Sequence, residues 1–130
     1  MLDISDVLRA ISDDKSLALF NMIAVALPLD SQDVMSRLGL TRRQYYSRMA
    51  QLTNAGLVDR RNGQHLLTSL GSVVYESHML IGYAVENYWR LKAIDSIEES
   101  NAENYEREMM INALIESSGI KRILQNTNNP

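Results

Sequence analysis

The sequence predicts a mainly helical fold with one small β-hairpin. Apolar residues recur at three- and four-residue spacing over most of the 130 residues, which is the pattern of amphipathic helices. The pair Asn62-Gly63 lies between two short extended segments, and it is the preferred pair for a tight hairpin turn. With only two Pro and six Gly, the composition argues against a loop-rich or disordered chain.

Three helices are expected before Gly39. They cover residues 3–11, Lys15–Ala26 and Gln32–Leu38. Asp13 and Asp14 offer capping oxygens for the second helix, and Pro28 ends it because proline disfavours helical geometry in the preceding residue. Asp30-Ser31 can cap the third helix, and Gly39 ends it because glycine tolerates left-handed geometry.

A fourth helix and a hairpin are predicted next. Thr41 and Gln44 form a T-x-x-Q capping box, so we expect a helix from Arg42 to about Asn54, closed by Gly56. Its apolar stripe consists of Tyr45, Met49 and Leu52. Two short strands then follow, at Leu57–Arg60 and His65–Thr68.

The rest of the chain is predicted to be helical. One helix runs from Ser69 to about Glu98 without proline, and its apolar side chains extend well beyond one face. A polar break at Glu99-Ser100-Asn101 follows, and then a helix around Ala102–Ser117, which Ser118-Gly119 ends. The chain finishes with a short turn at Ile120–Leu124 and a frayed tail at Gln125–Pro130.

The chain is short enough to be most simply one domain. We divide it into residues 1–71, residues 72–124 and a flexible tail at residues 125–130. The wide apolar surface of the long helix favours burial against a second copy and against the last helix, in a two-fold dimer. The expected dimer-interface residues are Tyr83, Tyr88, Trp89, Leu91, Ile94 and Met109. Several of these, with Tyr75 and Met110, would also suit an aromatic ligand pocket.

Positive charge is concentrated in the middle of the sequence. The net formal charge is −3, but residues 31–69 hold six basic and two acidic residues. Residues 1–30 hold two basic and five acidic residues, and residues 70–130 hold five basic and nine acidic residues. A basic centre between acidic ends indicates a local anionic partner.

Several classes of protein are not expected. The chain has no cysteine, which excludes disulfides, thiolate zinc sites and cysteine nucleophiles. His65 and His78 have no acidic cluster at ligand spacing, so we expect no metal site. The sequence contains neither a phosphate-binding glycine loop nor a catalytic triad pattern, so we expect no cofactor and no enzymatic activity. The N-terminus is acidic and the longest nearly uncharged stretch is too short to span a bilayer, so we expect a cytoplasmic protein without a membrane partner.

An ordered set of motifs resembles the winged helix–turn–helix of prokaryotic transcription regulators. These motifs are Leu38-Gly39-Leu40-Thr41, Leu52, Ala55-Gly56-Leu57-Val58 with Arg60, and Leu67-Thr68-x-x-Gly71. Regulators of the MarR and PadR types share this order, and small archaeal winged-helix regulators with a "QYYSR … AGLV … LT … G" pattern are more similar still. The resemblance covers residues 15–75. It implies a sequence-specific, double-stranded DNA-binding homodimer, whose recognition helix follows Thr41 and whose wing is Arg60–His65.

The residue types on this helix and wing suit contact with DNA. Arginine pairs bidentately with guanine and glutamine with adenine, while basic side chains and hydroxyls bind phosphate. The predicted DNA-binding residues are Thr41, Arg42, Arg43, Gln44, Tyr46, Ser47, Arg48, Arg60, Arg61, Asn62 and Gln64. Arg48 points sideways, where a phosphate contact and a local ion pair are both compatible with its position. Tyr45 is expected to be in the core.

Two other functions stay open from the sequence. A winged-helix module that binds an acidic protein surface within a transcription complex would use the same arginines without reading a DNA sequence. A small-molecule effector would add ligand sensing to a DNA-binding regulator, although no residue of the C-terminal helices identifies such a ligand.

Overall fold

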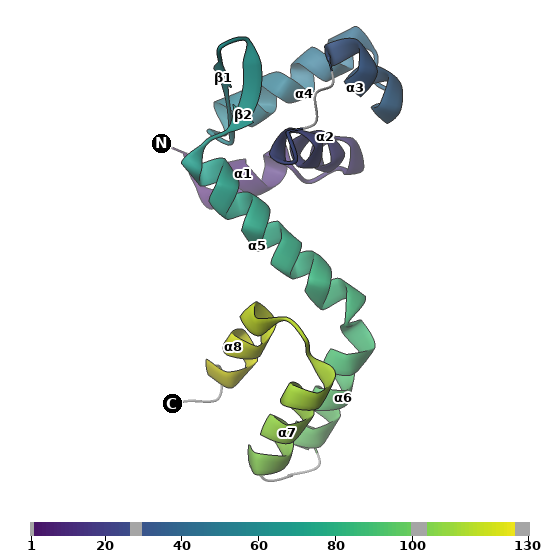
Figure 1. Ribbon diagram of the computed structural model, residues 1–130, viewed down its shortest axis with the longest axis vertical. Helices are drawn as coiled ribbons and strands as arrows, with labels where there is room; N and C mark the ends of the chain where they lie inside the picture. Colours follow the sequence, from purple (N-terminus) through teal and green to yellow (C-terminus); the bar gives the residue numbers. More distant parts are fainter. Residues whose placement is uncertain (1, 27–29, 100–103, 127–130) are drawn as a thin grey trace. The chain divides into compact units, whose positions relative to one another are not determined.

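The computed structural model describes residues 2–26, 30–99 and 104–126, which form eight helices and one two-stranded antiparallel hairpin (Figure 1). This confirms the predicted mainly helical class with a small hairpin. The elements are α1 (Ile4–Ala10), α2 (Asp14–Ala24), α3 (Ser31–Leu38), α4 (Arg42–Asn54), β1 (Val58–Arg61), β2 (Gln64–Leu67), α5 (Ser69–Glu86), α6 (Tyr88–Glu99), α7 (Asn104–Leu114) and α8 (Ser118–Asn126). The described residues divide into two compact units, one up to Glu76 and one from Ser77 onward.

The helices of the first unit begin at side-chain caps that the sequence predicts in part. The carboxylates of Asp13 and Asp30 accept hydrogen bonds from the third backbone N–H of α2 and α3. The capping box of α4 is confirmed, because Thr41 Oγ1 accepts from Gln44 N at 3.2 Å and Gln44 Oε1 accepts from Thr41 N at 3.0 Å. Gly39, at φ +64°, ends α3 in the left-handed region as expected.

One hydrophobic core lies between these helices and the hairpin. Its fully buried members are Leu19, Phe20, Leu52, Leu57 and Val58, and the predicted stripe residues Tyr45 and Met49 belong to the same core. The ring of Phe20 meets that of Tyr75 edge to face at 6.2 Å, which brings the start of α5 onto this core. The face of α4 that does not enter the core is exposed to solvent.

The hairpin has the tight turn that Asn62-Gly63 predicts. Both residues have positive φ, 52° and 80°, as a two-residue turn of this type requires. The pairs Arg60–His65 and Arg61–Gln64 close the ladder, so each strand lies one residue from its expected start. Strand β1 begins at Val58 and β2 ends at Leu67, and beyond them Thr68 N still donates to Leu57 O in the same register.

That contact fixes the start of α5. Thr68 N donates to Leu57 O at 3.0 Å, Thr68 Oγ1 donates to Gly56 O, and Gly71 N donates to Thr68 Oγ1 at 2.9 Å. A Cβ on Gly71 would lie 2.1 Å from Leu57 O, so only glycine permits this close approach. The Leu-Thr-x-x-Gly motif is therefore a structural clamp between the α4–β1 turn and α5.

The expected single helix from Ser69 to Glu98 is wrong, because the structure has two helices that meet at Asn87. The side-chain amide of Asn87 donates to Tyr83 O at 2.7 Å, and its backbone N–H is shared between Tyr83 O and Ala84 O. A side chain that competes for the helix's own carbonyl weakens the ladder at that point. Leu91 N still donates to Asn87 O at 3.0 Å, so the ladder resumes at once.

The second unit has a small core of its own. Ile94, Ile111, Ile115 and Ile120 are buried, and Leu91 packs against them. Arg107 is 6% exposed and its Nε donates to Glu98 Oε1 at 2.6 Å, which links α7 to α6.

Four predictions at the C-terminus are corrected. The last helix was expected to continue to Ser117, but α7 ends at Leu114, and the expected short turn Ile120–Leu124 is part of α8. Ser117 Oγ accepts from Ile120 N at 3.3 Å, so Ser118-Gly119 opens a helix instead of ending one. Gln125, expected in the tail, also lies in α8. The predicted roles of Pro28, Ser100, Asn101, Ala102 and residues 127–130 lie outside the described residues.

Candidate nucleic-acid interface

Helix α4 presents its predicted polar residues to solvent. Tyr45 is 5% exposed and Tyr46 is 56% exposed, so the adjacent tyrosines have opposite environments, as expected. The exposed residues at the helix start and on its outer face are Thr41, Arg42, Arg43, Gln44, Tyr46 and Ser47. Two exposed residues that the sequence analysis did not select, Ala50 and Asn54, continue the line of Arg43 and Ser47 at helical spacing. The helical period alone would have identified both.

Among the described helices of the first unit, α4 is the one whose first turn carries two basic residues and no acid. Helices α1, α2 and α3 each have an aspartate in the first turn, whereas α4 has none. Arg42 and Arg43 occupy that turn, next to the partial positive charge of the helix dipole. Within the described part of the chain, neither arginine forms an ion pair. The two arginines and the helix dipole together concentrate positive potential at this point, which favours binding of an anion. The same arrangement opposes the stability of α4, so a local rule of helix design is broken here, as is common at functional sites.

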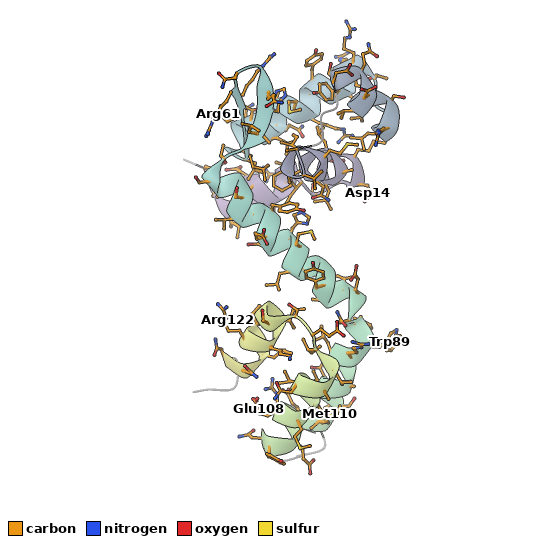
Figure 2. All side chains as sticks on the ribbon, in the orientation of Figure 1. Asp14, Arg61, Trp89, Glu108, Met110 and Arg122 are labelled. Atoms are coloured by element: carbon orange, nitrogen blue, oxygen red, sulfur yellow. The ribbon has the colours of Figure 1, made fainter. Side chains whose placement is uncertain are left out.

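The hairpin separates its two arginines by face. Arg60 shares a sheet face with buried Val58 and with its cross-strand partner His65, because side chains alternate along a strand. Arg61 lies on the opposite face, where its Nε is 3.4 Å from Asp59 Oδ2 (Figure 2). The sequence pattern predicts the same role for both residues, whereas only Arg60 faces the helices.

Arg60 and α4 border the same groove. This groove has a volume of about 330 Å³, and Tyr45 and Tyr46 line it from α4 while Arg60, Gly63 and Gln64 line it from the hairpin. The predicted residues Arg60, Gln64 and Tyr46 are thus brought together. Arg61 and Asn62 are exposed but do not line this groove.

The charges around the groove affect two neighbouring side chains. Burial raises the pKa of the Tyr45 hydroxyl, the nearby Tyr46 adds to the rise, and the positive charge of Arg60 opposes it. Burial lowers the pKa of His65, and Arg60 lowers it further. His65 is therefore neutral at pH 7, and the positive charge of the hairpin comes from Arg60 and Arg61.

Arg48 adopts the local ion pair, one of its two expected alternatives. Its guanidinium donates to Asp13 Oδ1 at 2.7 Å and to the buried Ser16 Oγ at 2.8 Å, and the side chain is 25% exposed. Ser16 N and Oγ also donate to the carboxylate of Asp13. The backbone hydrogen bond from Ser16, followed by the side-chain contacts of Ser16 and Arg48, holds the pKa of Asp13 below its ordinary value. Arg48 therefore joins α4 to the start of α2, and we leave it out of the candidate interface.

The predicted dimer-interface residues fall into two groups. Tyr83, Tyr88, Trp89 and Met109 are between 45% and 79% exposed, as surface residues must be to meet a partner. Ile94 is 2% exposed and lies in the core of its own unit, with Leu91 packed against it. Ile94 therefore lacks the free surface that an interface needs, whereas Leu91 is only partly buried.

Comparison with known proteins adds no assignment: no model of a protein family, no curated protein and no solved structure matches this chain at a significant level. The resemblance to winged-helix regulators therefore stays a prediction from sequence motifs. Among the described residues, no group of three or more His, Asp or Glu side chains is placed to hold a metal ion. No helix in the same part of the chain is long and apolar enough to cross a membrane.

Proposed function

We propose that this chain is a winged helix–turn–helix protein that binds double-stranded DNA as a homodimeric transcription regulator. The observation that carries the proposal is the start of α4, where Arg42 and Arg43 are exposed without a carboxylate partner among the described residues. Helix α3, the turn at Gly39 and α4 form the helix–turn–helix, and β1 and β2 form the wing. As a regulator it acts on DNA in the cytoplasm.

The recognition helix offers distinct groups for bases and for phosphates. Arg43, Ser47 and Tyr46 are exposed on α4 and are free to reach base edges in the major groove. Thr41 and Gln44 bond each other's backbone in the capping box, so we now assign them to helix initiation instead of base reading. Arg42 and Arg60 bind the phosphates beside the groove, while Arg61, Asn62 and Gln64 approach a neighbouring stretch of backbone.

A two-fold dimer would place two recognition helices about 34 Å apart on a near-palindromic site. The alternative, a module that binds an acidic protein surface, uses the same positive face. The two functions differ in their partner, because only duplex DNA releases condensed counterions when phosphates are neutralised. We favour DNA, because the guanidinium group of Arg43 and the hydroxyl groups of Tyr46 and Ser47 are exposed together on α4, and such a mixture is suited to base edges.

The test compares two variants of equal net charge. R42Q/R43Q removes two positive charges from α4, and R9Q/R122Q removes two exposed charges outside it. Binding sites selected from random duplexes should show a near-palindromic preference for the wild type and for the control. The R42Q/R43Q protein should bind at least about 30-fold more weakly, because its two lost contacts cost about 1–3 kcal/mol each. Absence of any selected sequence, with equal binding by both variants, would support the protein-interaction module.

A further inference from the structure

Five residues form an exposed apolar surface on the second unit, which we call the α5–α6 stripe. They are Ile81, Gly82 and Val85 near the end of α5 and Tyr88 and Trp89 at the start of α6, which follow one another at spacings of one, three, three and one residues across the junction at Asn87. Leu91 N donates to Asn87 O, so the hydrogen-bond ladder resumes directly after that junction. The exposed fractions are 61% for Ile81, 70% for Val85, 51% for Tyr88 and 79% for Trp89. The indole of Trp89 projects outward from α6 (Figure 2), and it meets the ring of Tyr88 edge to face at 5.2 Å.

Gly82 is the second and independent observation. Glycine within a helix destabilises it by about 1 kcal/mol relative to alanine, so an interior glycine needs a reason. The other two helical glycines have one, because a Cβ would meet Leu57 O at Gly71 and Leu80 Cδ1 at Gly119. A Cβ on Gly82 would meet nothing within 4 Å. The chain's own packing of the described residues therefore does not explain Gly82, whereas a partner that packs closely against the helix would.

The size and charge of the stripe fit a second copy of the same chain. Its four side chains expose on the order of 500 Å², so two stripes together cover about 1,000 Å², the threshold for a specific interface. Residues 77–85 contain no Lys, Arg, Asp or Glu, so two identical copies do not bring like charges together there. Ile81 and Trp89 are each four residues from Val85, which makes an antiparallel pairing about Val85 self-complementary.

We propose that two copies of the chain dimerise through the α5–α6 stripe, with the indole of Trp89 from each copy lying against Ile81 and Gly82 of the other. The glycine removes the side chain that would hold the ring away from the helix. Val85 meets its counterpart at the two-fold axis. Met109, on α7, lies outside this surface. The proposal rests on the proposed function only for the expectation of a homodimer, and its test uses no DNA.

Trp89 is the only tryptophan, so its fluorescence reports directly on the interface. The wild-type full chain should change from monomer to dimer in sedimentation velocity between about 0.1 and 100 µM, a range that covers ordinary dimer affinities. Over the same range the Trp89 emission maximum should shift to shorter wavelength as the indole leaves water. A monomer at every concentration, or a dimer whose emission stays that of an exposed indole, overturns the proposal.

Two variants and a control locate the contact. W89S should weaken dimerisation at least 30-fold, as loss of a central aromatic side chain does. G82A should raise the melting temperature of the diluted monomer by a few degrees, yet weaken dimerisation at least about 10-fold. The control Y105S removes an aromatic ring that is 70% exposed on α7, and it should leave dimerisation unchanged. The proposal is wrong if G82A dimerises as tightly as the wild type, or if Y105S loses as much affinity as W89S.

Discussion

Replacing Arg48 with methionine should destabilise the first unit without removing a DNA contact. The guanidinium makes two short hydrogen bonds, at 2.7 Å to Asp13 Oδ1 and at 2.8 Å to Ser16 Oγ. A hydrogen bond between charged groups contributes about 1.5–3 kcal/mol when it is protected from water. The side chain of Asp13 is 49% exposed, which reduces this value, and Ser16 keeps its own bonds to Asp13. We therefore expect R48M to lower the free energy of unfolding by about 1–2 kcal/mol.

Urea denaturation followed by far-UV circular dichroism measures this loss. R9M is the matched control, because Arg9 forms an exposed pair with Asp6 at 3.5 Å and its removal should change stability by less than about 0.5 kcal/mol. The pH dependence gives a second test. Since the pKa of folded Asp13 is below its ordinary value of 3.8, the stabilisation is present above pH 3.8 and is lost as the pH falls through the folded pKa. If R48M is as stable as R9M but binds DNA with a smaller salt dependence, Arg48 is a phosphate contact and the ion-pair reasoning is wrong.

Three further substitutions test the structural contacts by thermal unfolding. G71A should lower the free energy of unfolding of the first unit by about 3 kcal/mol or more, because the alanine Cβ would lie 2.1 Å from Leu57 O. A melting temperature equal to that of the wild type would contradict this close approach. E98A should destabilise the second unit by about 1–3 kcal/mol by leaving Arg107, 6% exposed, without its carboxylate, whereas E98Q should recover part of the loss through its amide oxygen. G63A should destabilise the hairpin by about 1 kcal/mol, because alanine is strained at φ +80°, and a neutral effect would exclude this turn geometry.

Features set by neighbours in the sequence were the most predictable. The capping box of Thr41 and Gln44 spans three residues, and the turn at Asn62-Gly63 needs positive φ that few residue types supply. The separation of Tyr45 from Tyr46 follows from the helical period and one apolar stripe. In each case the information is contained within a single turn of helix or a single hairpin.

Features that depend on distant residues were not predictable. Arg48 meets Asp13, 35 residues away, and no local pattern favours that pairing over a phosphate. Asparagine is tolerated in many helices, so its presence at position 87 does not by itself predict a break. The break accompanies the hydrogen bond from the side-chain amide of Asn87 to Tyr83 O, which the sequence does not specify. Ile94 was assigned to a dimer because its stripe is wide, but the packing of α7 and α8 was needed to show that its own unit buries it. The opposite faces of Arg60 and Arg61 follow from the inclusion of Arg61 in β1, one residue beyond the expected end of that strand.

The salt dependence of duplex DNA binding tests the central claim most directly. If Arg42, Arg60 and Arg61 of both copies neutralise phosphates, the logarithm of the binding constant should fall against the logarithm of salt concentration with a slope of about −5. The R42Q/R43Q protein should keep its fold and lose roughly one third of that slope with the phosphate contact of Arg42, whereas R9Q/R122Q should keep it. A slope near zero for the wild type, or one that both variants share unchanged, would contradict DNA binding by the positive face of α4 and the hairpin.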